Sequence, residues 1–407
     1  MDYRKYIAEK LNIEGIDTET LSSFIEIPPT LDMGDFALPC FKLAKVLRSS
    51  PITIADNLQK NFATDNVISS CMAVNGYLNF KLNRISTALE TLDKVLSEGD
   101  NYGSSDIGAN KTVLVEYSSI NIAKPFHIGH LSTTVIGSAL YKIYKFLGYD
   151  VVAINHLGDY GTQFGKLIVA YKKWSSIEAV KEGRLKELTR IYVKFHEEAK
   201  IHPELDDEAR RYFKLIETGD KDSNELFNLF KKITLEEVDK IYKLLNVKFD
   251  SYAGESFYTD KMAPIVEELK EKKLLKESDG ASIVDLEEYG MPPCLILKSD
   301  GSSLYATRDL AAAVYRYNTY HFYKSLYVVA YQQNLHFKQF FKVLELMGKP
   351  SHGVYKEFEK RFERINKKLG TKQYLVPYLI SSHPGSKMED AIALAEAIRD
   401  MGYMPEQ

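Results

Sequence analysis

The chain has 407 residues, of which 45% are hydrophobic and 27% are charged, and its formal net charge is −3 at pH 7. This length allows two to three domains with buried cores, and the charge excludes a global positive field, so any contact with RNA must come from local basic patches. Three scattered cysteines, Cys40, Cys71 and Cys294, argue against a disulfide framework, a zinc site or an iron–sulfur cluster.

The N-terminal sequence has no apolar leader, and no run of 18 apolar residues occurs anywhere in the chain. We therefore expect a cytoplasmic protein with no membrane partner. Residues 1–107 read as a small α/β domain. Its predicted elements are a short apolar run at Phe24–Ile27, a helical pattern at Phe36–Leu47, a half-buried strand at Cys71–Leu82 and a linker at Gly99–Asn110.

The next segment reads as a strand, a short loop and the start of a helix. An apolar, β-branched strand at Thr112–Tyr117 leads to a helical pattern over Leu131–Leu147, and His127 and His130 lie between them. Residues three apart at a helix N-terminus share one face, and that end of a helix favours bound phosphate. Gly129 allows a close approach to the backbone. The arrangement suits a nucleoside triphosphate.

The string from Glu116 to His130 resembles the first signature of class I aminoacyl-tRNA synthetases, and its flanking residues are similar to the arginyl-tRNA synthetase family. The resemblance covers residues 1 to about 348. It implies an α/β protein in which a small N-terminal domain precedes a class I nucleotide-binding fold with a parallel sheet. The segments Asp32–Ala37 and Asn75–Phe80 are similar to the family's N-terminal appended domain, which contacts tRNA.

Residues 111–349 are expected to form the catalytic domain. A second strand at Val151–His156 follows the first helix, so the loops 118–130 and 156–165 should meet at the carboxyl edge of a parallel sheet. From about 175 to 285 the pattern is charged and helical. The residues alone favour solvated helix faces there, and the resemblance implies an insertion that supports the acceptor end of tRNA.

A site selective for arginine needs a carboxylate, because the guanidinium group pairs with carboxylate in planar, bidentate fashion. Glu116, at a strand end, and Asp309, at a helix entry, are the candidates, and Tyr305 is spaced to share a helix face with Asp309. Alternatively, Asp309 is a helix cap. The resemblance implies that Glu116, Tyr305 and Asp309 read the guanidinium, while Asn121 and Gln333 hold the amino-acid end.

For ATP, the resemblance implies that His127 and His130 stabilise phosphate charge in the transition state, with Lys124 as an additional cation. The other residues expected at the nucleotide are Gly129, His156, Gly158, Asp159, His336 and Phe337. Two alternatives remain open: Asp159 caps the next helix, and Phe337 packs in the core. A strand at Ser325–Ala330 and a helix at Leu335–Met347 should complete this part of the fold.

The reaction that the resemblance implies is activation of arginine by ATP to arginyl-adenylate, followed by transfer to tRNA(Arg). Magnesium accompanies ATP in this chemistry, although the sequence offers no dedicated carboxylate cage. We expect no iron–sulfur cluster and no zinc, and the family's members are usually monomers. An alternative reading is a non-catalytic module that binds arginine, ATP or tRNA.

The resemblance ends near Gly348. We find no match to the family's second signature or to its anticodon-binding domain. The tripeptide Ser386-Lys387-Met388 resembles that signature only in part, because two acidic residues follow it. Residues 350–407 instead resemble a βα fragment of a radical S-adenosylmethionine protein, without that family's cysteine cluster. We therefore expect a chimeric chain with impaired activity, the alternative being a divergent C-terminus of the same protein.

Overall fold

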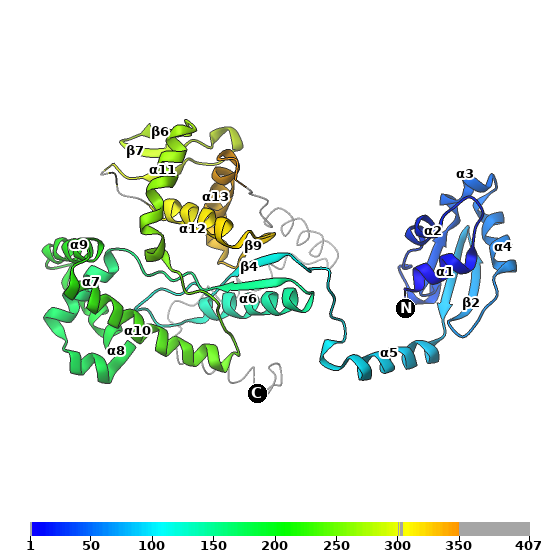
Figure 1. Ribbon diagram of the computed structural model, residues 1–407, viewed down its shortest axis with the longest axis horizontal. Coiled ribbons are helices and arrows are strands. Elements are labelled where there is room, and N and C mark those ends of the chain that lie inside the picture. The colour runs from blue at the N-terminus through cyan, green and yellow to red at the C-terminus, as the bar shows by residue number, and fades with distance from the viewer. Residues whose placement is uncertain (1, 300, 302–303, 350–407) are drawn as a thin grey trace. The chain divides into compact units, whose positions relative to one another are not determined.

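The computed structural model describes residues 2–299, 301 and 304–349. It divides into two compact units, residues 1–103 and residues from Ser104 onward, which are described separately (Figure 1). The expected foreign segment 350–407 lies outside the described residues. Among the helices of the described residues, none is long and apolar enough to cross a membrane.

The first unit is a three-stranded antiparallel sheet, ordered β1-β3-β2, with the four α-helices that precede β2 packed around it, whereas the helix that follows β3 buries none of its residues. Asp2, Asp17 and Ser50 begin three of the helices, because each side chain accepts from backbone N–H groups of the first turn. The elements are α1 (Tyr3–Leu11), α2 (Thr18–Phe24), β1 (Phe36–Pro39), α3 (Ala44–Leu47), α4 (Pro51–Asn61), β2 (Ile68–Val74), β3 (Tyr77–Leu82) and α5 (Arg84–Glu98).

Two sequence predictions in this unit were wrong. The single strand expected at Cys71–Leu82 is a hairpin of β2 and β3, since Asn75 and Gly76 have φ of 49° and 82° and turn the chain. The helical pattern over Phe36–Leu47 begins as strand β1, because residues 36–39 pair with β3. Long-range pairing overrides the local pattern there.

The second unit contains a three-stranded parallel sheet ordered β5-β4-β9, as the alternating strand and helix patterns predicted. The strands are β4 (Thr112–Glu116), β5 (Asp150–Ile154) and β9 (Lys324–Tyr327), and α6 (Ile128–Phe146) connects the first two. β4 is central and its residues 113–116 are buried. Its carboxyl end therefore opens directly onto the loops that carry the predicted site.

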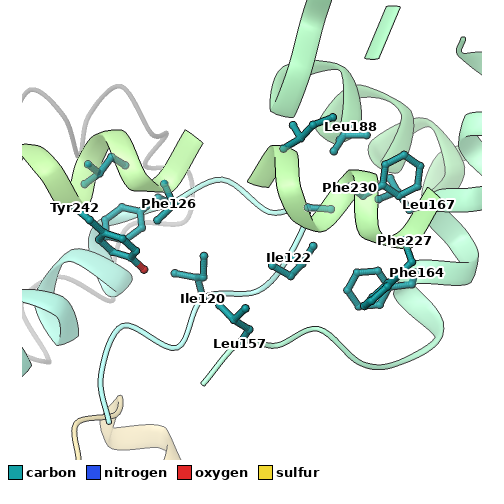
Figure 2. Close-up of a cluster of buried hydrophobic side chains, with 14 of the residues drawn as sticks. Ile120, Ile122, Phe126, Leu157, Phe164, Leu167, Leu188, Phe227, Phe230 and Tyr242 are labelled. Atoms are coloured by element: carbon teal, nitrogen blue, oxygen red, sulfur yellow. The ribbon is translucent and has the colours of Figure 1, made fainter. Parts of the chain in front are cut away.

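Four helices follow β5 and pack mainly on one another (Figure 1). They are α7 (Thr162–Trp174), α8 (Ile177–Glu198), α9 (Glu204–Glu217) and α10 (Lys221–Leu244), and α8 is kinked at Arg184. Their apolar faces continue the core of the sheet. Figure 2 shows Ile120 and Ile122 of the loop after β4 between Phe126 and Tyr242 on one side and the aromatic rings of α7 and α10 on the other.

The chain from residue 255 to the end of the described part forms a second core. Its elements are the 3₁₀ helix η4 (Glu255–Lys261), α11 (Met262–Glu271), β6 (Leu275–Ser278), β7 (Ala281–Val284), β8 (Cys294–Leu297), α12 (Tyr305–Tyr320) and α13 (Asn334–Leu346). The strands β6, β7 and β8 form an antiparallel sheet. The expected helical pattern up to residue 285 was wrong at its end, since β6 and β7 lie there.

Candidate active site

The two loops singled out in the sequence lie side by side at the carboxyl ends of β4 and β5. The amide of Ile122 donates to the carbonyl of Gly158 (3.2 Å), and the amide of Gly158 donates to the carbonyl of Ile120 (2.8 Å). A Cβ on residue 158 would lie 2.4 Å from the Asn121 Oδ1. Glycine at 158 is therefore what allows the Asn121 side chain to sit between the loops.

The loop after β4 is backbone-strained and is held by α10. Ser118, Ser119 and Ala123 have φ of 69°, 47° and 61°, a region that residues other than glycine rarely adopt. The Ala123 amide donates to Thr234 Oγ1 (3.0 Å), and Ser118 Oγ contacts the Tyr242 hydroxyl (2.7 Å). Side chains from one long helix thus fix the conformation of the loop that begins the site.

The two histidines of the signature face one another at the N-terminus of α6. Their rings stack with centroids 3.8 Å apart. His127 Nδ1 accepts from the Gly129 amide (3.1 Å), and His130 Nδ1 accepts from the His127 amide (3.3 Å). Since both Nδ1 atoms are acceptors, each neutral ring carries its proton on Nε2.

The surroundings of the two rings favour their neutral forms. Burial lowers the pKa of His130 to about 3, with His127 and Lys124 adding smaller electrostatic effects in the same direction. Burial, and then the charge of Lys124, also lowers the pKa of His127. At neutral pH the pair can therefore present two Nε2–H donors, which is the chemistry required to bind phosphate oxygens.

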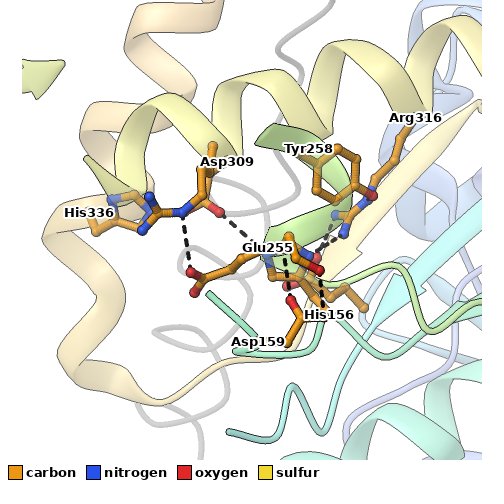
Figure 3. A network of polar contacts seen from close by, with 10 residues as sticks. His156, Asp159, Glu255, Tyr258, Asp309, Arg316 and His336 are labelled. Atoms are coloured by element: carbon orange, nitrogen blue, oxygen red, sulfur yellow. Dashed lines mark hydrogen bonds and ion pairs between the residues drawn. The ribbon is translucent and has the colours of Figure 1, made fainter. Parts of the chain in front are cut away.

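Glu116 pairs with an arginine of the chain itself (Figure 3). Its Oε2 accepts from Arg316 Nη1 at 2.5 Å, and the two side chains are 9% and 2% exposed. Glu116 raises the pKa of Arg316 against the opposing effect of burial, so the guanidinium stays charged. The sequence predicts that this carboxylate meets a guanidinium, and in the structure that guanidinium is an internal one, from Arg316.

Asp309 lies inside α12, one turn from its start, so the alternative of a helix cap was wrong. Its Oδ2 is 2.7 Å from His336 Nε2, and its Oδ1 is 3.8 Å from His156 Nε2. The Tyr305 ring lies 4.8 Å from the His336 ring. The structure thus brings together four predicted residues, Tyr305, Asp309, His156 and His336.

Glu255 is a further acid of this cluster that the sequence analysis missed. It begins η4, and Arg308 Nε lies 3.2 Å from its Oε2. Burial raises the pKa of Glu255; the charge of Arg308 opposes that rise, and the nearby carboxylate of Asp309 adds to it. Glu255 sits in a charged stretch whose pattern favours solvated helix faces. The only local signal was its place between Gly254 and Ser256, outside a regular helical pattern.

Asp159 and Phe337 have structural contacts. Asp159 is 1% exposed and accepts from Lys231 Nζ (2.5 Å) and from the amide and hydroxyl of Ser256 (2.9 and 2.8 Å). The alternative that it caps the next helix was wrong, because Gly161 precedes α7. Phe337 is buried in the second core beside Tyr327, which confirms the core alternative.

The remaining predicted residues are Asn121, Lys124, Gly129 and Gln333. Asn121 is half-buried and Lys124 is exposed, and Gly129 lies in the first turn of α6. Gln333 ends a 3₁₀ turn with its side chain exposed. Within the described ranges, no group of three or more His, Cys, Asp or Glu residues is arranged to hold a metal ion.

Comparison with known proteins decides the family. Residues 91–373 match the family model described as tRNA synthetases class I (R), catalytic domain. The chain belongs to this family. Residues 1–82 match the arginyl-tRNA synthetase N-terminal domain. The resemblance based on the Glu116–His130 string is therefore confirmed, and the class I match continues past the junction that we expected near Gly348.

Curated relatives agree with this assignment. The chain is 58% identical over 339 residues to the arginine–tRNA ligase of Clostridioides difficile, covering 83% of this chain and 60% of the relative. It is 57% identical over 349 residues to that of Clostridium acetobutylicum, covering 86% and 62%. The chain therefore spans about three fifths of the length of these relatives.

Solved structures agree on the fold. The arginyl-tRNA synthetase of Plasmodium falciparum superposes with a TM-score of 0.63 at 22% identity, covering 98% of this chain and 71% of that one. The enzyme of Thermus thermophilus gives 0.61 at 20% identity, covering 97% and 73%. The predicted class, an α/β class I synthetase fold with a small N-terminal domain, is confirmed.

Proposed function

We propose that this synthetase-family chain carries the arginine- and ATP-binding part of an arginine–tRNA ligase. The observation that carries the proposal is the Asp309 carboxylate, which two imidazoles flank on the same edge of the parallel sheet as the loop leading to His127 and His130. A carboxylate fixed by donors, beside a helix N-terminus suited to phosphate, fits a cationic amino acid next to a nucleotide.

For arginine, we assign the guanidinium to Asp309 and Glu255, with Tyr305 covering it. We prefer Glu255 to Glu116 because Glu116 is 9% exposed in its ion pair with Arg316 at 2.5 Å, whereas Glu255 is 25% exposed and lies farther, 3.2 Å, from Arg308. Glu116 is instead assigned to holding Arg316. Asn121, between the loops, and Gln333 are assigned to the amino-acid end of the substrate.

For ATP, the Nε2–H groups of His127 and His130 donate to phosphate oxygens as charge builds there. Lys124, exposed in the same loop, adds a positive charge near them. Gly129 leaves the backbone accessible. His156 and Gly158 lie on the substrate side of the neighbouring loop, whereas Asp159 holds that loop in place, and His336 acts through Asp309 rather than on adenosine.

The reaction is attack of the arginine carboxylate oxygen on the α-phosphorus of ATP. The new oxygen–phosphorus bond gives arginyl-adenylate, and the bond to pyrophosphate breaks. A terminal ribose hydroxyl of tRNA(Arg) then takes the arginyl group and releases AMP. The residues described supply positioning and charge stabilisation, and Mg²⁺ enters on the ATP phosphates rather than in a protein cage.

The organisation we propose follows the same assignment. Residues 1–107 contact tRNA, residues 111–349 form the catalytic domain, and the region 175–285 is an insertion that supports the acceptor end. The protein acts as a cytoplasmic monomer. A foreign origin of the tail that begins near residue 350 stays our proposal, although residues up to 373 still match the family model. DNA sequencing across codon 349 tests it: continuous coverage would show that the chain is made as one piece, and broken coverage would make the junction an artefact.

The test of the function is arginine-dependent exchange of pyrophosphate into ATP with tRNA(Arg) present, together with calorimetric titration of arginine. Asp309→Asn should weaken arginine binding about a hundredfold, since a charge-assisted bidentate pair is lost, while Asp207→Asn, on an exposed carboxylate, should not. Binding without exchange would reduce the proposal to a binding module. Equal affinities of both variants would remove Asp309 from the site.

A further inference from the structure

His156 is a half-buried imidazole with different surroundings at its two ring nitrogens. Its Nδ1 lies 3.1 Å from Arg316 Nη2, which belongs to the guanidinium that also pairs with Glu116. Its Nε2 is buried and has no hydrogen-bond partner within the described part of the chain. The carboxylate oxygen Asp309 Oδ1 lies 3.8 Å from that nitrogen. Figure 3 shows His156 between the Arg316 pair and Asp309.

The contact with Arg316 determines where the imidazole proton can be. A guanidinium has five N–H donors and no acceptor, so its partner atom must carry a lone pair. Nδ1 of His156 is therefore the unprotonated nitrogen, and the proton of the neutral ring sits on Nε2. A proton on Nδ1 would point at an N–H of Arg316, so the contact disfavours the tautomer that is protonated on Nδ1.

We propose that Arg316 is a positioning residue that fixes His156 in the Nε2–H tautomer, so that His156 and His336 together hold the carboxylate of Asp309 for an arginine substrate. The proposal rests on the proposed function for the identity of that substrate. The Nε2–H of His156 closes onto Asp309 Oδ1 when the substrate binds, while His336 already contacts Oδ2. Each carboxylate oxygen keeps a second lone pair for the guanidinium.

Charge explains why such an arrangement suits a cationic substrate. One N–H donor at each oxygen orients the Asp309 carboxylate, and a neutral His156 does so without adding positive charge beside it. Arg316 itself contributes no net charge to the pocket, because Glu116 neutralises it and both side chains are buried. The Tyr258 hydroxyl, 3.4 Å from Arg316 Nε, adds a third contact to the guanidinium. The internal ion pair thus orients a neutral donor rather than repelling the substrate.

The first test reads the tautomer directly. The full chain is labelled with ¹⁵N-histidine, and correlations between ring protons and ring nitrogens are recorded at neutral pH. The signals of His156 are identified by their loss in His156→Gln. The proposal expects an unprotonated Nδ1 and a protonated Nε2. A ring protonated on Nδ1, or on both nitrogens, would overturn it.

The role of Arg316 is tested by replacing the buried pair with a neutral pair of similar size, Arg316→Met with Glu116→Gln, which avoids leaving one charge unpaired. The His156 signals should change to a mixture of tautomers, and arginine affinity should fall roughly tenfold, as expected for the loss of one oriented hydrogen bond. Unchanged signals and unchanged affinity would overturn the positioning role.

A second pair of variants touches only His156. A glutamine amide can occupy the position of Nε2, whereas an asparagine amide can occupy only that of Nδ1. His156→Gln should keep arginine affinity within about threefold of the parent, and His156→Asn should lose roughly tenfold. Equal losses would contradict the proposal. If the parent chain binds no arginine at all, the proposed function fails, and the tautomer measurement still decides the assignment of Arg316.

Discussion

His130 couples the chemistry of the site to the stability of the fold. Because its folded-state pKa is about 3, far below the ordinary value of 6.5, the unfolded chain takes up the proton first as pH falls. The contribution of neutral His130 to the unfolding free energy is therefore complete above about pH 6.5 and is lost as pH drops toward 3. Each pH unit in that window costs about 1.4 kcal/mol of unfolding free energy.

We expect the unfolding free energy to fall by about 2 kcal/mol more between pH 6.5 and 5 in the parent chain than in His130→Asn. Asparagine can keep the acceptor for the His127 amide but does not titrate. Denaturation followed by the fluorescence of Trp174, the chain's one tryptophan, measures this in the second unit. If the unfolding free energy falls equally with pH in the two proteins, the lowered pKa of His130 is contradicted.

Gly158 affects arginine binding through the Asn121 side chain. In Gly158→Ala the new methyl group would lie 2.4 Å from Asn121 Oδ1, so the Asn121 side chain has to rotate away. Arginine affinity should fall about tenfold, while unfolding free energy falls by less than about 1 kcal/mol because only a side chain moves. Calorimetric titration measures the arginine affinity, and denaturation followed by Trp174 fluorescence measures the unfolding free energy.

The control for Gly158→Ala is the same change made in an Asn121→Ala background. With no amide to displace, the alanine at 158 should cost little further affinity. A double-mutant cycle measures the difference. If the loss at 158 is the same in both backgrounds, the glycine acts through something other than Asn121.

At the scale of elements, α10 holds the strained loop of the site. Thr234 is fully buried, and its hydroxyl accepts from Ala123 and donates to the carbonyl of Phe230 (2.9 Å). Thr234→Val keeps the volume but leaves the Ala123 amide unpaired at a positive φ. We expect a loss of about 1–3 kcal/mol in urea unfolding monitored by Trp174.

Thr234→Ser is the matched control, because it keeps the hydroxyl and removes only a methyl group. It should be closer to the parent in stability than the valine variant. The reverse order would mean that packing of the methyl group, and not the hydrogen bond to the loop, holds Ala123 in place.

The sequence predicted the elements whose signals are local. The alternating strand and helix patterns around His127 predicted β4, α6 and β5, and the i, i+4 spacing placed Tyr305 and Asp309 on one helix face. The partner of Glu116 is 200 residues away, at Arg316, and no local pattern indicates such a pair. Glu255 was hidden for the same reason, since only the tertiary fold brings it to Asp309.

The strand β1 shows the same limit at the level of secondary structure. Residues 36–47 have helical spacing, yet Phe36–Pro39 is extended because it pairs with β3, which lies more than 35 positions later in the chain. The hairpin at Asn75-Gly76, in contrast, had a local signal that a period-two reading of Cys71–Leu82 overlooked. In this segment the turn signal of Asn75-Gly76 outweighs the alternation of apolar and polar residues over Cys71–Leu82.

At the scale of the whole molecule, the two units have separate cores. The core of the first unit is built on Leu38, Leu78 and Phe80. The second unit has two cores, one under the parallel sheet and one around α12. The proposed arginine-binding residues all belong to the second unit. A ligand that binds only the folded form of that unit should stabilise it and leave the first unit unchanged.

Hydrogen exchange with and without arginine tests this division. At arginine concentrations about 100-fold above the dissociation constant, the second unit gains about 2.7 kcal/mol, so amides that exchange by its global unfolding should slow about a hundredfold. Peptides from residues 2–103 should exchange at unchanged rates. Lysine is the control, because its ammonium cannot pair bidentately with Asp309 and should protect neither unit. Equal protection of both units would mean that the cores are thermodynamically coupled, since binding energy gained at Asp309 would then have to reach Leu38 and Phe80.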